Sequence, residues 1–302
     1  MRSGFSIVRN GDSLGYPWRE SLRSLAPLVD EIVVAHGDST DTTLASLEIL
    51  AKELPCPLRI LNSPWDPANT KGGSELARQS NIALAACAHE ICVYIQGDEV
   101  LHEKEYTQLR ADLERFEKDE DVDGLTLEWI HFYGTFENVV RSRRWYRREV
   151  RAVKKSRGLQ SYGDAQGFRI PTGDGKWTKP RTALSTAHCL HYGWVRPPEV
   201  MARKSQALDR LWHGSARDGT HDPKGAFPPH FGMHRYQGSH PQVMRARIEA
   251  FHKDFPNYNP FAGAEVPRDG KYWSLKLTDL VESLTGWRPG EFKNYRLVKI
   301  YR

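Results

Sequence analysis

The sequence predicts an α/β protein built on a mostly parallel, Rossmann-like sheet, and two observations support this prediction. The first hundred residues alternate short β-type runs with amphipathic helical patterns, which is typical of a layered α/β domain. The chain has 302 residues, enough to bury a sizeable core. Right-handed crossovers make strands of this kind parallel, so we expect their carboxyl ends to meet at one edge of the sheet.

Four strands are expected in this half, over residues 5–8, 31–35, 58–61 and 91–96. Apolar residues at helical spacing predict the helices between them. The first helix is marked by Leu14, Trp18, Leu22 and Leu25, the second by Leu44, Leu47 and Leu54, and the third runs from near Ser74 to about Ala88. This order of elements repeats the strand–helix unit of a parallel sheet.

The second half begins with a helix over residues 106–116 and a strand over residues 125–129. Beyond residue 190 the pattern becomes mainly helical. Pro198 stands at an expected first turn before Met201, Leu208 and Leu211, and a second helix is expected after Pro241. Residues 214–240, rich in Gly, Pro and His, are expected to form a loop.

The composition indicates a globular protein, with 39% hydrophobic and 27% charged residues. No apolar run approaches the roughly 20 residues that a bilayer requires. The amino terminus lacks the apolar stretch of a signal peptide, so we expect a cytoplasmic protein without a transmembrane segment. The four cysteines show no metal-type spacing and are expected to be reduced.

The clearest chemical signal follows the fourth strand, where an apolar run stops at Asp98 and Glu99. Carboxylates at this position suit Mg²⁺ or Mn²⁺, because such cations take oxygen ligands and often share them with substrate phosphates. Asn10, Asp38 and Asp41 also follow strands. Because open α/β sheets bind ligands at the carboxyl ends of their strands, we expect these side chains to meet in one crevice.

The same elements, in their order and spacing, resemble the family-two glycosyltransferases with the GT-A fold. The resemblance covers roughly residues 5–105. It rests on Arg9-Asn10 after the first strand, Asp38-Ser39-Thr40-Asp41 after the second, Ala77-Arg78 on the third helix, and Gln96-Gly97-Asp98-Glu99 after the fourth strand. Members of the family usually carry a Ser-Thr-Asp element after the second strand and an Asp-X-Asp element after the fourth.

This resemblance implies a GT-A-like three-layer α/β/α sandwich with a helical C-terminal extension. It places a glycosyltransferase domain at residues 1–195, with a nucleotide-sugar-binding half at 1–105 and an acceptor half at 106–195. Residues 196–302 are expected to form a mainly helical extension packed on that domain. The activity implied is metal-dependent, inverting transfer of a sugar from a nucleotide diphosphate sugar to an acceptor hydroxyl.

The resemblance also implies roles for single residues. Asp98 is expected to bind Mn²⁺ or Mg²⁺ at the donor diphosphate, and His191, in His191-Tyr-Gly-Trp, to complete the metal shell. Contacts to the donor are expected from Arg9, Asn10, Asp38, Asp41, Arg78 and Gln96. Asp38 and Asp41 equally suit helix caps, Arg78 equally suits an exposed helical arginine, and His191 also suits a packed, hydrogen-bonded histidine.

The sequence departs from the family pattern at two places. His36-Gly37 stands where the family usually has an acid that helps to hold the nucleobase, and Gln96 replaces the first acid of Asp-X-Asp. The metal site therefore loses one negative charge. A carbohydrate- or nucleic-acid-binding protein that keeps the fold and has lost its chemistry stays open as an alternative. So does a sugar nucleotidyltransferase, although Arg9-Asn10-Gly11-Asp12 lacks the Gly-rich signature of that class.

On the acceptor side, an inverting transferase needs a general base for the acceptor hydroxyl. Asp164, in a polar segment before Phe168, is the preferred candidate, and Glu128 is the alternative. The acceptor itself is not readable. The segment from Arg141 to Arg157 holds nine cations in seventeen residues and interleaves them with Trp145 and Tyr146. This composition suits a phosphorylated or nucleic-acid acceptor, and at least equally a strand pair whose arginines face solvent or the donor phosphates.

Overall fold

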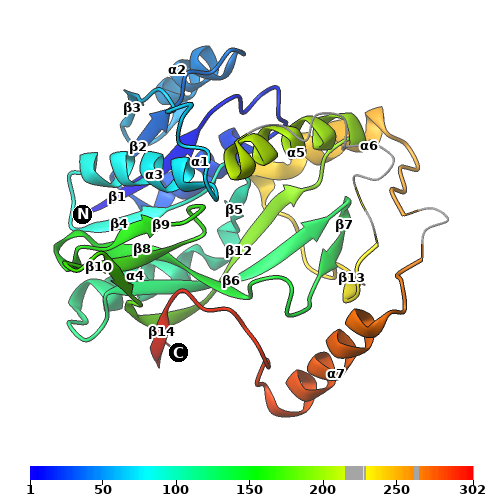
Figure 1. Ribbon diagram of the computed structural model, residues 1–302. Coiled ribbons are helices and arrows are strands. Elements are labelled where there is room, and N and C mark those ends of the chain that lie inside the picture. The colour runs from blue at the N-terminus through cyan, green and yellow to red at the C-terminus, as the bar shows by residue number, and fades with distance from the viewer. Residues whose placement is uncertain (215–226, 228, 262–264, 302) are drawn as a thin grey trace.

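The structure is a computed structural model that describes residues 1–214, 227, 229–261 and 265–301. An eleven-stranded sheet runs through the molecule, with a separate three-stranded sheet beside it. Helices lie on both faces of the large sheet (Figure 1). The fold class predicted from the sequence, a three-layer α/β/α sandwich, is therefore confirmed.

The N-terminal half of the sheet is parallel. Its strands are β1 (Arg2–Val8), β2 (Glu31–His36), β3 (Leu58–Asn62) and β4 (Ile91–Tyr94). They pair in the order β3-β2-β1-β4. The chain adds β2 and then β3 on one side of β1, and β4 then pairs with the other side of β1. The strand order reverses between β1 and β4, and such a switch point is where open α/β sheets form their ligand crevice.

Three helices cover one face of the sheet and one covers the other. The first group is α1 (Trp18–Leu25), α2 (Thr43–Glu53) and α4 (Tyr106–Lys118), whose apolar side chains share one core cluster. Helix α3 (Ser74–Ala86) packs in the second cluster on the opposite face. Because successive side chains of a strand point to opposite faces, the fully buried strands of this half are apolar on both sides.

Helix α1 starts later than its apolar spacing predicts. Leu14 lies in the turns that follow β1, and the helix begins at Trp18, directly after Pro17. The backbone N–H of Leu14 donates to the carbonyl of Asn10 at 3.1 Å, and Asn10 itself has a φ of 50°. Asparagine tolerates this left-handed conformation, which reverses the chain at the end of β1.

The second half of the sheet is mixed. Strand β8 (Arg148–Lys154) pairs antiparallel with β4 and with β6 (Gly124–Tyr133), and β12 (Arg181–Trp194) pairs parallel with β6. Strand β5 (Glu99–Leu101) pairs antiparallel with β12, and β7 (Thr135–Val140) pairs antiparallel with β6. The small sheet consists of β9 (Gln160–Tyr162), β10 (Gly167–Thr172) and β11 (Lys176–Thr178).

Helices α5 (Pro198–His213), α6 (Arg245–Asp254) and α7 (Gly270–Thr285) dominate the C-terminal third, as expected. Two short strands were not anticipated: β13 (Met233–Arg235) pairs with β7, and β14 (Arg296–Ile300) pairs with β12 (Figure 1). The boundary expected at residue 195 stays a prediction. Of the expected loop over residues 214–240, residues 215–226 and 228 lie outside the described part of the chain.

Within the described ranges, no helix is both long and apolar enough to cross a bilayer. The four cysteines are free and buried.

Candidate functional site

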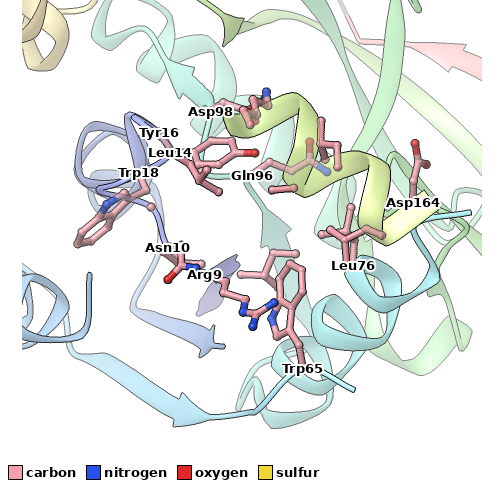
Figure 2. A pocket seen from close by; sticks show the side chains of 18 of the residues that line it. Arg9, Asn10, Leu14, Tyr16, Trp18, Trp65, Leu76, Gln96, Asp98 and Asp164 are labelled. Atoms are coloured by element: carbon pink, nitrogen blue, oxygen red, sulfur yellow. The ribbon is translucent and has the colours of Figure 1, made fainter. Parts of the chain in front are cut away.

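A cavity of about 380 Å³ opens at the switch point between β1 and β4. Its lining comes from the end of β1 and the turns after it, the start of α1, the loop after β3, helix α3, the turn after β4, the loop between β9 and β10, and helix α5 (Figure 2). Among its lining residues are Arg9, Asn10, Tyr16, Trp65, Gln96, Asp98, Asp164 and Lys204. Five residues expected from the sequence therefore reach one cavity, namely Arg9, Asn10, Gln96, Asp98 and Asp164.

One end of the cavity combines an aromatic ring with a guanidinium. Arg9 lies over the ring of Trp65 at 5.0 Å and forms an ion pair with Asp38, with 3.0 Å between Nε and Oδ1. Figure 2 shows Arg9 and Trp65 together, on the side of the cavity away from Asp98 and Tyr16. Asn10 is held beside them because its Oδ1 accepts from the backbone N–H of Thr40 at 2.8 Å.

Three other expected donor contacts lie outside the lining. Asp38 pairs with Arg9, and Asp41 accepts from the backbone N–H groups of Ser13 at 2.8 Å and Thr43 at 3.0 Å. Arg78 pairs with Glu75 at 2.6 Å and donates to the carbonyl of Pro64. Asp41 and Arg78 thus connect backbone segments near the cavity. Their contact with a sugar donor stays a prediction.

Gln96, which stands in place of the first family acid, connects two sides of the cavity. Its Nε2 donates to the carbonyl of Ala165 at 3.0 Å, and its backbone N–H donates to Glu99 Oε2. Ala165 has a φ of 63° and directly follows Asp164. A carboxylate at position 96 has no N–H to donate, so the amide is specific to this loop contact.

Glu99 takes part in a buried ion pair instead of facing the cavity. Its two oxygens accept from Arg151 Nε at 2.9 Å and Nη2 at 2.6 Å, and both side chains are almost completely buried. The guanidinium also lies over Trp129, with 4.2 Å to the ring centroid. A bidentate pair of this kind satisfies both carboxylate oxygens, so Glu99 acts in the scaffold of the site.

Asp98 lies beside two buried cations. Lys204 Nζ on α5 is 3.3 Å from Asp98 Oδ2 and also donates to the carbonyl of Gly193 at 2.7 Å. Arg196 donates through Nε to the carbonyl of Leu14 at 2.8 Å and through Nη1 to that of Gly193. Its guanidinium lies over Tyr16 at 4.5 Å.

These neighbours determine the pKa values of the cluster. Burial raises the pKa of Asp98, but Lys204, His191 and Arg196 outweigh it and hold that pKa at about 2. Burial, together with the nearby Arg196, lowers the pKa of Lys204 to about 7, against the attraction of Asp98. An anion bound beside Lys204 would favour its charged form.

His191 approaches Asp98 as part of a histidine pair. Its Nε2 lies 3.7 Å from Asp98 Oδ2, and its Nδ1 lies 3.1 Å from Nδ1 of the buried His131. His131 Nε2 is 2.7 Å from the carbonyl of Tyr146, which can only accept, so Nε2 carries the proton. Burial lowers the pKa of His131 to about 3 and also lowers that of His191. Neighbouring His188 pairs with Glu105 instead.

The residues around Asp98 do not fit a divalent cation. Over the described residues, no group of three or more His, Cys, Asp or Glu side chains is placed to hold a metal ion. Glu99 is occupied by Arg151, and Gln96 turns its amide to Ala165. Asp98 and His191 do come together, as the sequence predicts, but the nearest charged partner of Asp98 is an ammonium.

Asp164 is the second carboxylate in the cavity lining. Burial raises its pKa above the ordinary value for aspartate. It packs against Gly73, where an added Cβ would lie 2.9 Å from the Asp164 Cβ, and Gly73 has a φ of 73° that suits glycine. The alternative base, Glu128, is bound to Arg148 in an ion pair on the paired strands β6 and β8.

The basic segment from Arg141 to Arg157 is largely used inside the fold. Seven of its nine cations donate to other parts of the protein: Arg143, Arg147, Arg148, Arg151, Lys154, Lys155 and Arg157. The segment does form part of a strand pair, β6 with β8, but most of its cations bind protein groups instead of facing solvent. An anionic acceptor bound there stays a prediction.

Sequence reasoning missed Lys204, Arg196, Tyr16 and Trp65. A signal for Lys204 was present: it lies three residues after Met201 and four before Leu208, hence on the apolar face of the helix. A lysine on such a face must either reach solvent or find partners inside. The other three residues carry no comparable pattern, because their positions depend on how distant segments pack.

No protein-family description matches this chain, and no curated protein does either. Solved structures do show similarity of the backbone. A structure of residues 1–349 of the S. aureus protein TarS matches over 94% of this chain and 81% of that 1–349 chain, with 15% identity and a TM-score of 0.37. Its complex with UDP-GlcNAc matches over 93% and 81%, with 16% identity and a TM-score of 0.38.

A second similar structure is glucosyl-3-phosphoglycerate synthase from Mycobacterium tuberculosis, in complex with Mn²⁺, UDP and phosphoglyceric acid. It matches over 43% of both chains, with 21% identity and a TM-score of 0.29.

Proposed function

We propose that this protein is an inverting glycosyltransferase that takes its sugar from a nucleotide diphosphate sugar bound at the switch-point cavity. One observation carries the proposal. The cavity gathers an aromatic–guanidinium end, a buried lysine and a carboxylate of raised pKa from four separate parts of the chain. Its volume of about 380 Å³ is in the range of small-molecule sites.

The two ends of the cavity suit the two ends of such a donor. Trp65 and Arg9 offer stacking surfaces for a nucleobase, and the side chain of Asn10 lies next to them. Asp98 lies across the cavity from them (Figure 2), and Lys204 Nζ is 3.3 Å from its Oδ2, so the charge of a diphosphate bound there would meet an ammonium. The sugar is then expected between Lys204 and Asp164.

Asp164 is proposed as the general base. In a single displacement, the acceptor oxygen forms a bond to the anomeric carbon while the bond from that carbon to the phosphate oxygen breaks. The acceptor proton passes to the carboxylate, and the nucleoside diphosphate leaves with the bonding electrons. A raised pKa brings the carboxylate closer to the working pH, which favours proton transfer.

Asp164→Asn tests this role. With water as the acceptor, we expect wild type to release nucleoside diphosphate from at least one of UDP-glucose, UDP-GlcNAc, GDP-mannose and ADP-glucose. Loss of a general base should lower kcat by about 10² to 10⁴, with little change in donor KM. Wild-type activity should fall as pH drops through the raised pKa of Asp164, because protonation removes the base, and the variant should lose this limb.

The matched control is Asp174→Asn. Asp174 lies in the turn between β10 and β11 of the same small sheet and outside the cavity lining, so kcat should be unchanged. Calorimetry separates the remaining outcomes. Donor binding without any turnover favours the binding-protein alternative, and failure of every donor in the panel to bind contradicts the proposed function.

A further inference from the structure

Asp98 belongs to a buried cluster with more positive than negative side chains, of which Asp98 and Lys204 line the cavity and Arg196 lies outside its lining. Asp98, Lys204 and Arg196 are exposed by only 7%, 5% and 1%. The cluster therefore holds one carboxylate against two cationic groups. The nearby His191 is an imidazole and brings no negative charge. Buried charges are normally balanced by partners. An anion completes this balance, whereas a divalent cation would increase the imbalance.

Unused hydrogen-bond donors point the same way. Arg196 Nη2 is buried and finds no acceptor among the described residues. Lys204 carries three N–H donors, and the described residues supply two acceptors for them, Asp98 Oδ2 and the Gly193 carbonyl. Because Lys204 also lines the cavity, its remaining donor is available to a bound ligand.

The position of Lys204 is held by its surroundings. Its ammonium lies 5.0 Å from the ring of Tyr16 and 5.5 Å from that of Trp194. Asp98 and the Gly193 carbonyl fix the head group between these two rings. A preorganised charge of this kind stabilises developing negative charge without reorganisation during the reaction.

We propose that Lys204 takes the place that the family resemblance assigns to a metal ion, so that the donor diphosphate is held by the Lys204 ammonium and no divalent cation is needed. This inference rests on the proposed function. As the bond between the anomeric carbon and the phosphate oxygen breaks, the electron pair stays on the leaving diphosphate, and the ammonium stabilises that charge. Asp98 acts as a positioning residue for Lys204.

The test measures affinity by calorimetry for UDP, GDP, ADP and CDP, each in excess EDTA and again with Mn²⁺. We expect at least one nucleoside diphosphate to bind in EDTA, with its affinity changed less than about twofold by Mn²⁺. Lys204→Met should weaken that binding about tenfold or more, the usual effect of losing a charge-assisted hydrogen bond. The affinity for the corresponding nucleoside monophosphate should fall less in Lys204→Met than the affinity for the diphosphate.

Two variants serve as controls. Arg203→Met removes a neighbouring cation of α5 that is exposed and outside the cavity lining, and it should leave the affinity unchanged. Lys204→Met alone leaves the Asp98 carboxylate buried without its ammonium partner, which can destabilise the fold. The double variant Asp98→Asn/Lys204→Met removes that unpaired charge and is therefore tested as well. The double variant should also lose the diphosphate, whereas Asp98→Asn alone, which keeps the Lys204 ammonium and its contact with the Gly193 carbonyl, should weaken binding less than Lys204→Met does.

The outcomes distinguish the inference from the function on which it rests. Binding that disappears in EDTA, returns with Mn²⁺ and ignores Lys204→Met would overturn the role of Lys204 and leave the proposed function standing. Loss of nucleoside diphosphate binding in Asp98→Asn but not in Lys204→Met would likewise overturn the role of Lys204 and leave the proposed function standing. If none of the four nucleoside diphosphates binds in any condition, the proposed function fails together with the inference.

Discussion

Gln96 shows how a single substitution in a motif can change its task. In the family pattern an acid occupies this position, and its loss suggested a weakened metal site. The structure gives the amide a different partner, since Nε2 donates to Ala165 beside Asp164. The same substitution that removes a negative charge from the cavity also fixes the loop that carries the proposed base.

Gln96→Glu should therefore destabilise the protein instead of restoring the acidic site of the family pattern. The new carboxylate cannot donate to Ala165 and lies near the Glu99 carboxylate, whose Oε2 already accepts from the residue 96 backbone. We expect a loss of about 1–3 kcal/mol in the free energy of unfolding. Chemical denaturation of the purified variant measures it.

Gln96→Met is the matched control, because it removes the same hydrogen bond without adding charge. It should cost about 1 kcal/mol and leave no new affinity for metal. A Gln96→Glu protein that is as stable as wild type, and that gains tight Mn²⁺ binding, would contradict this account of position 96.

At the residue level, the sequence predicted several residues that line the cavity, but it did not predict the charged partner of Asp98. Arg9, Asn10, Gln96, Asp98 and Asp164 reach the cavity because strand ends and one loop converge there. The partner of Asp98 was not predictable in the same way. Lys204 belongs to a helix more than one hundred residues away in the chain, and only packing brings the two charges together.

At the level of elements, the passage from β12 to α5 determines the geometry of the charge cluster. The carbonyl of Gly193 accepts from both Lys204 and Arg196. Gly193 also has no room for a side chain. An added Cβ would lie 2.4 Å from His191 Nε2 and 2.8 Å from Asp98 Oδ2. The strand end therefore has to be glycine for the histidine and the carboxylate to approach it.

Gly193→Ala should disturb the cluster without unfolding the protein. Overpacking of this kind costs about 1–3 kcal/mol of stability. Since the displaced carbonyl positions Lys204, nucleoside diphosphate affinity should fall about tenfold, a change that calorimetry detects. Gly270→Ala at the start of α7 is the control, because a Cβ there meets nothing within 4 Å. Unchanged affinity in Gly193→Ala would show that this strand end does not position Lys204.

Element boundaries were predictable where periodicity was strong. Strands β1 to β4 and helices α2 to α4 lie within a few residues of their expected positions. The start of α1 was not, because Leu14 keeps the helical spacing although Pro17 and the left-handed Asn10 hold the chain in turns. Strands β13 and β14 are short and only pair with distant strands, so no local pattern marks them.

At the level of the whole molecule, strand order explains why the site lies where it does. In the order β3-β2-β1-β4, strands β2 and β4 lie on opposite sides of β1. The connections after β1 and β4 therefore leave the sheet in opposite directions, and the crevice forms between the turns after these two strands. Helix α5 lies over this crevice from the C-terminal third and contributes Lys204. The fold class followed from the alternation of the first hundred residues, but this contribution of the last hundred did not.

The most direct test is a crystal structure of the protein grown in EDTA with the nucleoside diphosphate that binds best among UDP, GDP, ADP and CDP. The account predicts the base near Trp65 and Arg9, and a phosphate oxygen within hydrogen-bond distance of Lys204 Nζ. A nucleotide bound elsewhere on the surface, or one that enters the cavity only with Mn²⁺ bridging its phosphates to Asp98, would contradict it.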